Sequence, residues 1–402
     1  MVLSLVLLPS LPLLVYYFWY CLSFGGGDFA MPSIDMFRRF PVPTAKSVII
    51  VAGWLIFQAL LQVYVPGEKV RGAPLGDGAR LSYIINGWSV WWLTWILLIS
   101  GAALGLYSPA ALTDEFGALL TTTNIFAVLG GAYLYWHGKL HNGGQERITN
   151  NVICDLWLGT ALNPRIGDFD LKLFLETRPG LIAWPVLDVA FAARQFERDG
   201  IVSGSMLLVC AFHFWYVADC FAHEQAILDT WDIRHENLGW MLCFGNLVWV
   251  PFTYTIQAQY LVYHSPDLSW WLIAAIVVLF VVGYGIFRGA NRQKHRFRQN
   301  PDRIIWGQTA VSIRTSRGPS LLASGWWGLA RHVNYLGDLL MGLAWCLPCG
   351  FNSPLPYFYA VYLSILLVHR ERRDHAFCAN RYGKDWDLYC AKVPYRIIPG
   401  LY

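Results

Sequence analysis

The 402-residue chain has few charged residues, since Asp, Glu, Lys and Arg make up 14% of it, against roughly 25% in soluble domains. It contains no Walker motif, no Gly-x-Ser-x-Gly motif and no N-glycosylation sequon. Disorder is excluded because 56% of the residues are hydrophobic and 16% are aromatic. The formal net charge of +4 is too small to indicate a nucleic-acid-binding protein.

Long apolar stretches without a charged residue dominate the chain. A helix needs about 20 residues to cross a hydrocarbon core of about 30 Å. The stretches that qualify are residues 1–27, 47–65, 81–113, 116–137, 201–218, 237–266, 268–287 and 339–369, and residues 181–193, interrupted by Asp188, are a further candidate. The stretch 339–369 is long enough for two short helices, with a turn at Pro348, Gly350, Pro354 and Pro356. The sequence predicts an all-α polytopic membrane protein with eight to ten transmembrane helices.

The N-terminus and the cysteines give two further expectations. No Lys or Arg precedes Arg38, so we expect a retained first helix and no cleaved signal peptide. The nine cysteines, an odd number and mostly within apolar stretches, indicate reduced packing residues, including Cys346 and Cys349 of a C-x-x-C sequence.

His137 and His141 are four residues apart, a spacing that metal ligands can use. No carboxylate or cysteine accompanies them at ligand spacing. They are therefore interpreted as surface histidines near an interface, and no metal site is predicted.

Half of the basic residues lie in two short blocks. Residues 288–317 and 370–396 hold 15 of the 30 Lys and Arg residues. Because the blocks flank the apolar hairpin 339–369, they lie on the same side of the membrane, and the positive-inside tendency makes that side cytoplasmic. The membrane would be the endoplasmic reticulum in a eukaryote and the inner membrane in a bacterium.

Polar residues recur at helical spacing in three places on this basic side. The three stripes are Asn291, Lys294 and Arg298; Arg331, Asn334, Tyr335 and Asp338; and Arg370, Asp374, Cys378 and Tyr382. Residues three and four apart share a helix face. Lys and Arg match phosphate oxygens, and aromatic side chains nearby could stack on rings: Trp326, Trp327, Tyr335, Tyr382 and Tyr389. The stripes predict a nucleotide or similar anionic ligand; for Lys294 and Arg298 taken alone, contact with anionic lipid headgroups is an equal alternative.

Gly283, Gly285 and Gly289 read G-x-G-x-x-x-G. This misses the dinucleotide-binding fingerprint by one residue and has no parallel strand before it. We interpret these glycines as positions where helices pack closely.

Several longer motifs resemble those of the sterol reductases, over about residues 151–402; the N-terminal third matches only in hydropathy. The motifs are Leu-Asn-Pro-Arg-Ile-Gly at 162–167, Arg-Pro-Gly-Leu at 178–181, residues 287–294, Gly-Trp-Trp-Gly-Leu-Ala-Arg-His-Val-Asn-Tyr-Leu-Gly-Asp at 325–338, and residues 369–383 and 393–399. Residues 241–259 and 343–350 look more like the branch that reduces the sterol C14 double bond, which includes the lamin B receptor. The chain departs from the family at Cys154, Thr160, Ala161 and Arg381.

The resemblance implies an NADPH-dependent reductase with ten membrane helices, an N-terminal transmembrane region over residues 1–150 and one integrated catalytic region over 151–402. It implies cofactor-binding positions at Lys294, Arg298, Leu322, Trp327, Asn334, Tyr335, Asp374, Cys378, Ala379, Asn380, Arg381, Tyr382 and Tyr389, with Arg370 one helical turn before Asp374. The expected partners are a sterol substrate and the lipid bilayer, with no nucleic acid and no protein partner.

An isolated trisubstituted alkene is a poor hydride acceptor, so protonation at C15 should come first and hydride transfer from NADPH to the C14 cation second. The resemblance implies Tyr216 and Asp374 as proton donors. Arg370 and Arg373 would lower the pKa of Asp374 and make it a poor acid, unless burial raises that pKa. A phenol with a pKa of ~10 can donate at the end of a hydrogen-bonded relay. We therefore expect Tyr216 to deliver the proton, with Asp374 positioning the nicotinamide or closing the relay.

Asp219, His223 and Glu224 either line the same cavity or cap the helix that carries Tyr216. The alternative activities are a sterol reductase acting at C7 and, more remotely, a membrane methyltransferase of the isoprenylcysteine type or a non-enzymatic membrane tether. The methyltransferases share the Arg-His-x-x-Tyr pattern of residues 331–335 but lack the block at 369–374.

Overall fold

The computed structural model of the chain describes residues 2–74, 78–140, 149 and 151–402. They divide into two compact units, Met1–Ser265 and Pro266–Tyr402, and both are mostly helical. This division lies further along the chain than the boundary expected after residue 150. That residues 151–402 act as one catalytic region stays a prediction.

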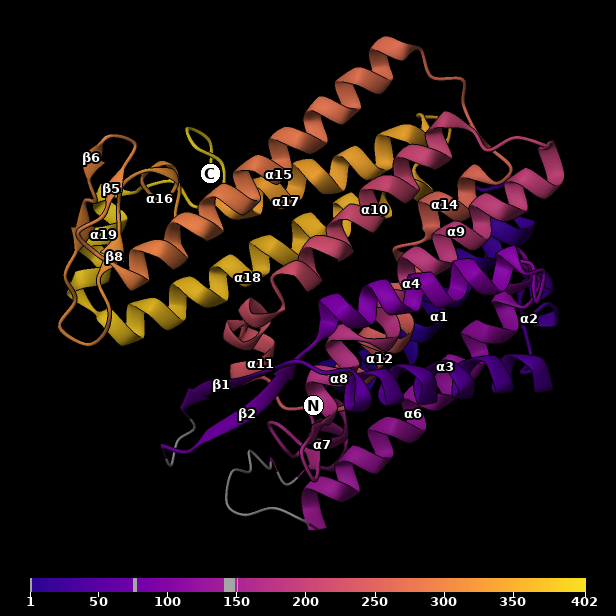
Figure 1. The fold of residues 1–402 in the computed structure, drawn as a ribbon, viewed down its shortest axis with the longest axis horizontal. Coiled ribbons are helices and arrows are strands. Elements are labelled where there is room, and N and C mark those ends of the chain that lie inside the picture. Colours follow the sequence, from indigo (N-terminus) through magenta and orange to yellow (C-terminus); the bar gives the residue numbers. More distant parts are fainter. Residues whose placement is uncertain (1, 75–77, 141–148, 150) are drawn as a thin grey trace. The chain divides into compact units, whose positions relative to one another are not determined.

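The first unit contains helices of very different lengths and two antiparallel two-stranded sheets (Figure 1). Its helices are α1 (Val2–Phe24), α2 (Ile34–Arg38), α3 (Ala45–Tyr64), α4 (Gly87–Ala103), α5 (Ala111–Asp114), α6 (Phe116–Leu140), α7 (Val152–Leu158), α8 (Leu171–Thr177), α9 (Pro179–Asp199), α10 (Gly204–Ala222), η1 (Glu224–Asp229), α11 (Trp231–His235), α12 (Trp240–Phe244), η2 (Gly245–Trp249), α13 (Val250–Thr253) and α14 (Ile256–Leu261). Its strands are β1 (Glu68–Pro74), β2 (Arg80–Ile85), β3 (Arg165–Ile166) and β4 (Phe169–Asp170).

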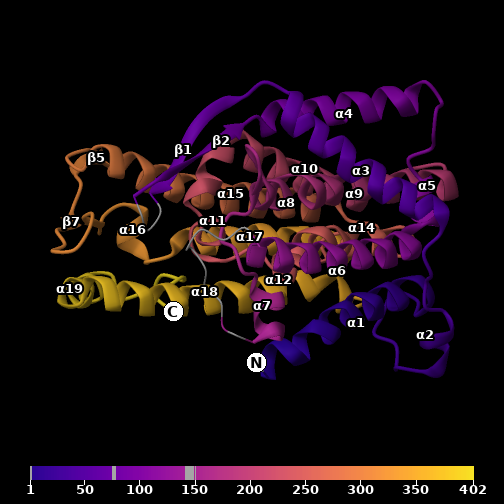
Figure 2. The same ribbon diagram turned by 90° about the horizontal axis from the view of Figure 1, so that it is seen from below.

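The second unit is built on three long helices that lie side by side, with short strands and helices at one end (Figures 1 and 2). The long helices are α15 (Trp270–Gln299), α17 (Val333–Cys346) and α18 (Phe358–Tyr382). The shorter elements are β5 (Ile304–Ile305), β6 (Gln308–Thr309), β7 (Ser312–Ile313), β8 (Leu321–Leu322), α16 (Trp326–Leu329), η3 (Leu347–Cys349), η4 (Leu355–Tyr357) and α19 (Lys384–Lys392). The turn predicted within residues 339–369 is confirmed by η3 and η4, but the two helices that it joins are not confined to that stretch: α17 begins before it and α18 ends after it.

Within the described ranges, five helices are long and apolar enough to cross a membrane: Ser4–Phe24, Ala45–Tyr64, Phe116–Leu140, Gly204–Ala222 and Trp270–Gln299. Each coincides with a predicted stretch. The total of about ten spans stays a prediction.

The outward face of α3 shows why lipid is its surrounding medium. Ile49 and Ile56 are 71% and 60% exposed, whereas Gln58 is fully buried and donates to Thr94 Oγ1 at 3.2 Å. A surface helix of a soluble protein exposes its polar residues and buries its apolar ones. The reversed pattern of α3 is that of a helix whose outer face contacts hydrocarbon and whose inner face makes interhelical hydrogen bonds.

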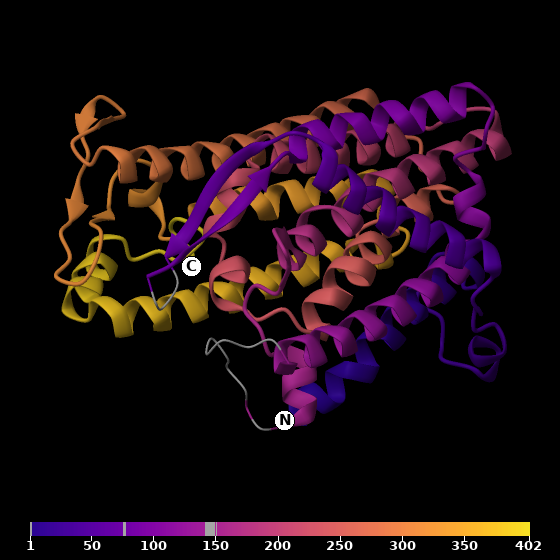
Figure 3. The ribbon, with the colours of Figure 1, turned by 60° about the horizontal axis from the view of Figure 1, so that its bottom comes forward.

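The start of the predicted helical stretch 81–113 is wrong, because residues 80–85 form strand β2. It pairs antiparallel with β1, with Tyr83 opposite Val70, in a hairpin that joins α3 to α4 (Figure 3). Tyr83 is buried beneath the Arg165 guanidinium, whose Cζ lies 4.7 Å from the ring centroid. The absence of charge made these residues resemble a span, but their exposed and covered side chains partly follow the two-residue period of a strand.

The predicted stretch 237–266 is interrupted rather than continuous. A π-helical turn, η2, separates α12 from α13, and the Asn246 carbonyl in this turn lies against Gly180 of α9, where no Cβ would fit. Pro251 follows at the start of α13 and lacks a backbone N–H, so it cannot continue the helical hydrogen bonding. Neither feature changes hydropathy, which is why the break was not predicted.

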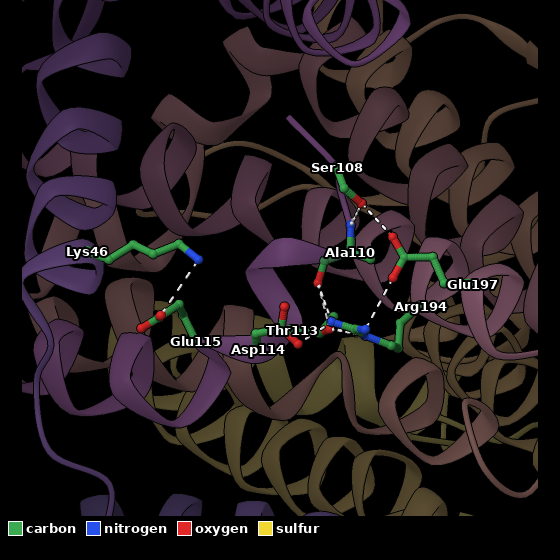
Figure 4. A network of polar contacts seen from close by, with 8 residues as sticks. All are labelled: Lys46, Ser108, Ala110, Thr113, Asp114, Glu115, Arg194 and Glu197. Carbon is green, nitrogen blue, oxygen red and sulfur yellow. Dashed lines mark hydrogen bonds and ion pairs between the residues drawn. The ribbon is translucent and has the colours of Figure 1, made fainter. Parts of the chain in front are cut away.

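Polar contacts at one end of the first unit connect α9 to the chain around α5 (Figure 4). Arg194 donates to Thr113 Oγ1 at 2.8 Å, pairs with Asp114, and lies 3.1 Å from Glu197. Glu197 also accepts from Ser108 Oγ at 2.7 Å. The short helix α5 is thereby held against the C-terminal turns of α9.

A fully buried ion pair holds the opposite end of the same unit. Arg178 Nη2 lies 2.6 Å from Glu224 Oε1, and neither side chain is exposed. The second carboxylate oxygen accepts from the Gly87 N–H at 2.6 Å, and Arg178 also donates to Asn86 Oδ1 at 2.8 Å. The pair therefore joins the start of α4, the α8–α9 junction and the start of η1.

Replacing Arg178 by Leu should destabilise the protein severely, because Glu224 would keep a buried charge without its counter-ion. Loss of one partner of a buried pair costs about 3–5 kcal/mol. Thermal unfolding in detergent measures this loss. Arg39→Leu, which breaks a half-exposed pair with Asp35, is the control and should change the melting temperature little. Equal shifts for the two variants would contradict the interpretation.

Candidate functional site

All but one of the residues predicted to form the site lie in the second unit, where α15 ends, α17 begins and α18 leads into α19 (Figure 2). The exception is Tyr216, which lies on α10 of the first unit. Two of the three predicted stripes are helical throughout, on α15 and α18. The third is not, because α17 begins at Val333 and Arg331 precedes it.

Lys294 and Trp327 form the α15 side of the site. The Lys294 ammonium lies 4.0 Å from the Trp327 ring centroid, a cation–π contact. The Trp327 indole N–H donates to the Ala290 carbonyl at 2.8 Å, one turn before Lys294. Leu322 of β8 is buried in the same cluster as Trp327 and Ala290. The indole orientation is therefore determined by α15, and Lys294 lies over its face.

Arg331 and His332 are positioned by a later segment of the chain. Their backbone N–H groups donate to the carbonyls of Tyr395 and Arg396 at 3.0 and 2.8 Å. The Arg331 side chain donates to Cys390 Sγ at 2.6 Å, so it points toward α19 and not along the predicted stripe.

Asp374 is the central carboxylate of the site. Its Oδ2 lies 3.3 Å from His332 Nε2, and the His332 ring stacks on Tyr335 with centroids 4.9 Å apart. Burial raises the pKa of Asp374, but the hydrogen bond and charge of His332 and the charge of Lys294 outweigh it, so the pKa is held below its ordinary value. Asp374 is therefore a carboxylate at neutral pH.

Cys378, Tyr382 and Tyr389 continue the site toward α19. Cys378 Sγ lies 3.8 Å from Asp374 Oδ2, and both tyrosines are buried in a cluster against which Cys378 and Ala379 pack. Tyr389 Oη donates to the Trp327 carbonyl at 3.5 Å, which connects this cluster to the α15 side.

The cations of the site lie around its tyrosines. Burial raises the pKa of Tyr335 to about 12, and the charge of Arg370 opposes this rise most. Burial likewise raises the pKa of Tyr382, where Arg381 and Arg298 oppose it. The Arg381 Cζ lies 5.4 Å from the Tyr382 ring centroid. Asn380 is exposed beside Arg381.

These residues suit a ligand that carries both negative charge and planar rings. Lys294, Arg298 and Arg381 supply positive charge, and the rings of Trp327 and Tyr335 supply partly or fully buried faces. Asn334 Oδ1 is buried and receives no hydrogen bond from any residue that the structure describes. An amide or amino N–H of a ligand would satisfy this acceptor.

His332 was not predicted as a site residue, although it lies inside the Arg-His-Val-Asn-Tyr motif. Its spacing from Asn334 and Tyr335 belongs to no helical stripe, because it precedes α17. The short sequence distance from Tyr335 was the available signal.

Tyr216 is partly exposed, and its ring centroid lies 6.1 Å from that of Trp184 on α9. Behind it, His213 Nδ1 lies 2.8 Å from Asp188 Oδ2 and 3.1 Å from the Trp184 indole nitrogen; neither His213 nor Asp188 is exposed. One member of this pair had a signal in the sequence, because Asp188 is an acidic residue within an apolar stretch.

The three polar residues after Tyr216 separate into two groups. Glu224 forms the buried ion pair with Arg178 and begins η1, so it acts in the fold and does not line a cavity. Asp219 and His223 pair with each other at 3.3 Å.

The structure also locates most residues of the weaker sequence patterns: the cysteines, the three glycines and His137. Cys346 and Cys349 are free and buried. The other seven cysteines are also free, and each is buried or partly buried. Gly283 lies against the Gly337 carbonyl of α17 and Gly289 against the Trp326 indole, as close packing requires, whereas Gly285 has open space around it. His137 lies on α6, and His141 lies outside the described residues.

The Cys378 thiol should react slowly with iodoacetamide, because the thiolate is the reactive form and burial, with the charge of Asp374, raises the thiol pKa to about 12. Asp374→Asn removes that charge, so the pKa should fall and alkylation at neutral pH should become faster. Mass spectrometry of the Cys378 peptide measures the rate. Asp385→Asn, at a carboxylate that accepts from Ser316, is the matched control. An unchanged rate in Asp374→Asn would contradict the contact.

Comparison with known proteins extends the likeness beyond the motifs. Residues 4–402 match the model of the Ergosterol biosynthesis ERG4/ERG24 family, so the match also includes the N-terminal third. The chain is 50% identical over 404 residues to a delta(14)-sterol reductase of Methylotuvimicrobium alcaliphilum, covering 99% of this chain and 94% of that protein. It is 45% identical to those of Dictyostelium discoideum (97% and 88% covered) and Schizosaccharomyces pombe (91% and 88%). With this extent of similarity, and with helices suited to a bilayer, the chain is a multi-pass membrane protein that belongs to the ERG4/ERG24 family of ergosterol biosynthesis.

Proposed function

We propose that this protein is a delta(14)-sterol reductase that reduces the C14=C15 double bond of a sterol intermediate with NADPH. One observation carries the proposal: cations, stacking rings and a carboxylate gather at one end of α15, α17 and α18, in a chain 50% identical over nearly its whole length to a protein of that name. Lipid headgroups alone do not account for this site, because headgroup binding does not require the stacking of His332 on Tyr335.

NADPH fits the residues that are present. Lys294, Arg298 and Arg381 would hold its phosphates, and Trp327 and the tyrosines would lie against its rings. Asn334 Oδ1 would accept from an amide or amino group. When bound, NADPH supplies the hydride for the reduction. The cofactor side of the site would face the cytoplasm, because both basic blocks belong there by the positive-inside tendency.

The two candidate acids, Asp374 and Tyr216, differ in their ability to donate a proton. Asp374 lies between His332 and Lys294, both of which favour its charged form, so it has no proton to donate near neutral pH. Its charge can instead hold cations and donor groups in place. Tyr216 offers a phenolic O–H, and its ring lies near that of Trp184 on α9. We therefore assign proton donation to Tyr216 and positioning to Asp374.

Product analysis tests the activity directly. Purified protein in lipid nanodiscs, given NADPH and a sterol with a C14 double bond, should yield the product two hydrogens heavier. A C7-unsaturated sterol should remain unchanged. Mass spectrometry separates these outcomes. NADPH should raise the melting temperature and S-adenosylmethionine should not, because only a ligand that binds the folded state stabilises it. Reduction of the C7 substrate alone would overturn the regiochemistry, and stabilisation by S-adenosylmethionine alone would overturn the reductase.

Tyr216→Phe should lower kcat by about 10²–10⁴-fold, the usual contribution of a general acid, while NADPH affinity stays unchanged. Asp374→Asn should weaken NADPH binding as well. Steady-state rates and cofactor titration distinguish the two residues. Tyr133→Phe, at a 48% exposed tyrosine of α6, is the matched control. Wild-type turnover by Tyr216→Phe would show that another group donates the proton.

A further inference from the structure

Titratable residues follow one face of α10 on both sides of Tyr216. His213, Tyr216, Asp219 and His223 are separated by three, three and four residues, which places them along a single stripe. The helix ends at Ala222, so His223 caps its C-terminal end. The stripe therefore runs from the interior of the first unit to one end of the helix.

The two ends of this stripe differ in exposure. The His213 side chain is fully buried, Tyr216 is partly exposed, the Asp219 side chain is 9% exposed and the His223 side chain is 39% exposed. His223 Nδ1 lies 3.3 Å from Asp219 Oδ1 and 3.0 Å from the Asp219 carbonyl oxygen. The exposed His223 and the nearly buried Asp219 are thus in direct contact.

The proposed reaction needs such a connection. Each reduction adds one hydride and one proton to the alkene, so Tyr216 is left as a phenolate after its O–H bond breaks and the C15–H bond forms. The phenolate must regain a proton before the next turnover, and apolar side chains exclude bulk water from the interior of a membrane protein.

The other buried groups nearby are poor sources of this proton. His213 and Asp188 are fully buried against Trp184, so they would need a supply of their own. Glu224 is fully buried in its pair with Arg178. Among the residues that the structure describes, Asp219 and His223 combine helical spacing from Tyr216, direct contact with each other and an exposed end.

We infer that Asp219 and His223 form a proton path that reloads Tyr216 from solvent after each turnover, an inference that rests on the proposed function. The Asp219 carboxyl gives its proton to the Tyr216 phenolate, directly or through one water. The resulting Asp219 carboxylate takes a proton from the His223 imidazolium, and His223 takes one from water. The sum is the uptake of one solvent proton per sterol reduced, with NADPH as the reductant.

Loss of proton reloading should slow only the turnovers after the first, whereas loss of proton donation should slow every turnover. In Asp219→Asn and His223→Gln, side-chain size and hydrogen bonding are kept but the proton path is cut. Tyr216 begins protonated, so NADPH oxidation in the first turnover should keep its wild-type rate. Later turnovers should slow by about tenfold to a hundredfold, within the range of proton-transfer effects. Rapid mixing of enzyme with the C14-unsaturated sterol and NADPH records both phases.

Asp229→Asn is the matched control, because Asp229 lies in η1 near His223 but pairs with Arg234 and is off the stripe; both phases should match wild type. The double variant Asp219→Asn/His223→Gln should be no slower than the slower single variant, since both residues act in one path. Equal slowing of both phases, or no slowing in either variant, would overturn the proton path. Wild-type protein that leaves the C14 double bond unreduced would instead overturn the proposed function, and the path with it.

Discussion

The close crossing of α15 and α17 determines the geometry of the second unit. Gly283 and Gly337 meet there without side chains, so the two backbones approach further than any larger residue would allow. From this point α15 continues to Lys294, about 16 Å further along its axis, and α17 leads back to His332 at its N-terminal end. The distance between the cation and the imidazole on either side of Asp374 thus depends on two residues that contribute no chemistry.

The helical parts of the site could be predicted because their spacing has a physical meaning. Lys294 and Arg298 on α15, and Asp374, Cys378 and Tyr382 on α18, lie at intervals that only a helix brings to one face. The apolar stretches were equally informative, since a bilayer admits few structures other than helices.

Features that depend on backbone detail were not predictable from such patterns. Residues 81–85 of strand β2 and the π-helical turn η2 contain no charged residue, so the absence of charge does not distinguish them from the spans around them. Arg331 was assigned to a stripe because of its spacing, whereas its side chain reaches Cys390, 59 residues later. Contacts between segments far apart in the sequence have no local signature, and the pairing of Asp188 with His213 was missed for the same reason.

The two units carry opposite charge: the first has 14 basic and 19 acidic residues, and the second 16 basic and 7 acidic. An excess of positive charge raises the local concentration of anions near it. This excess suits a unit assigned to a phosphorylated ligand.

His332 is held by backbone contact with Arg396, 64 residues further along the chain. During synthesis on a ribosome, α15 can enter the bilayer before that segment has been translated. The imidazole beside Asp374 would then lack its anchor until translation reaches Arg396. Maturation of the site is in this way coupled to completion of the polypeptide, and incompletely translated chains would be inserted in the membrane without a fully ordered site.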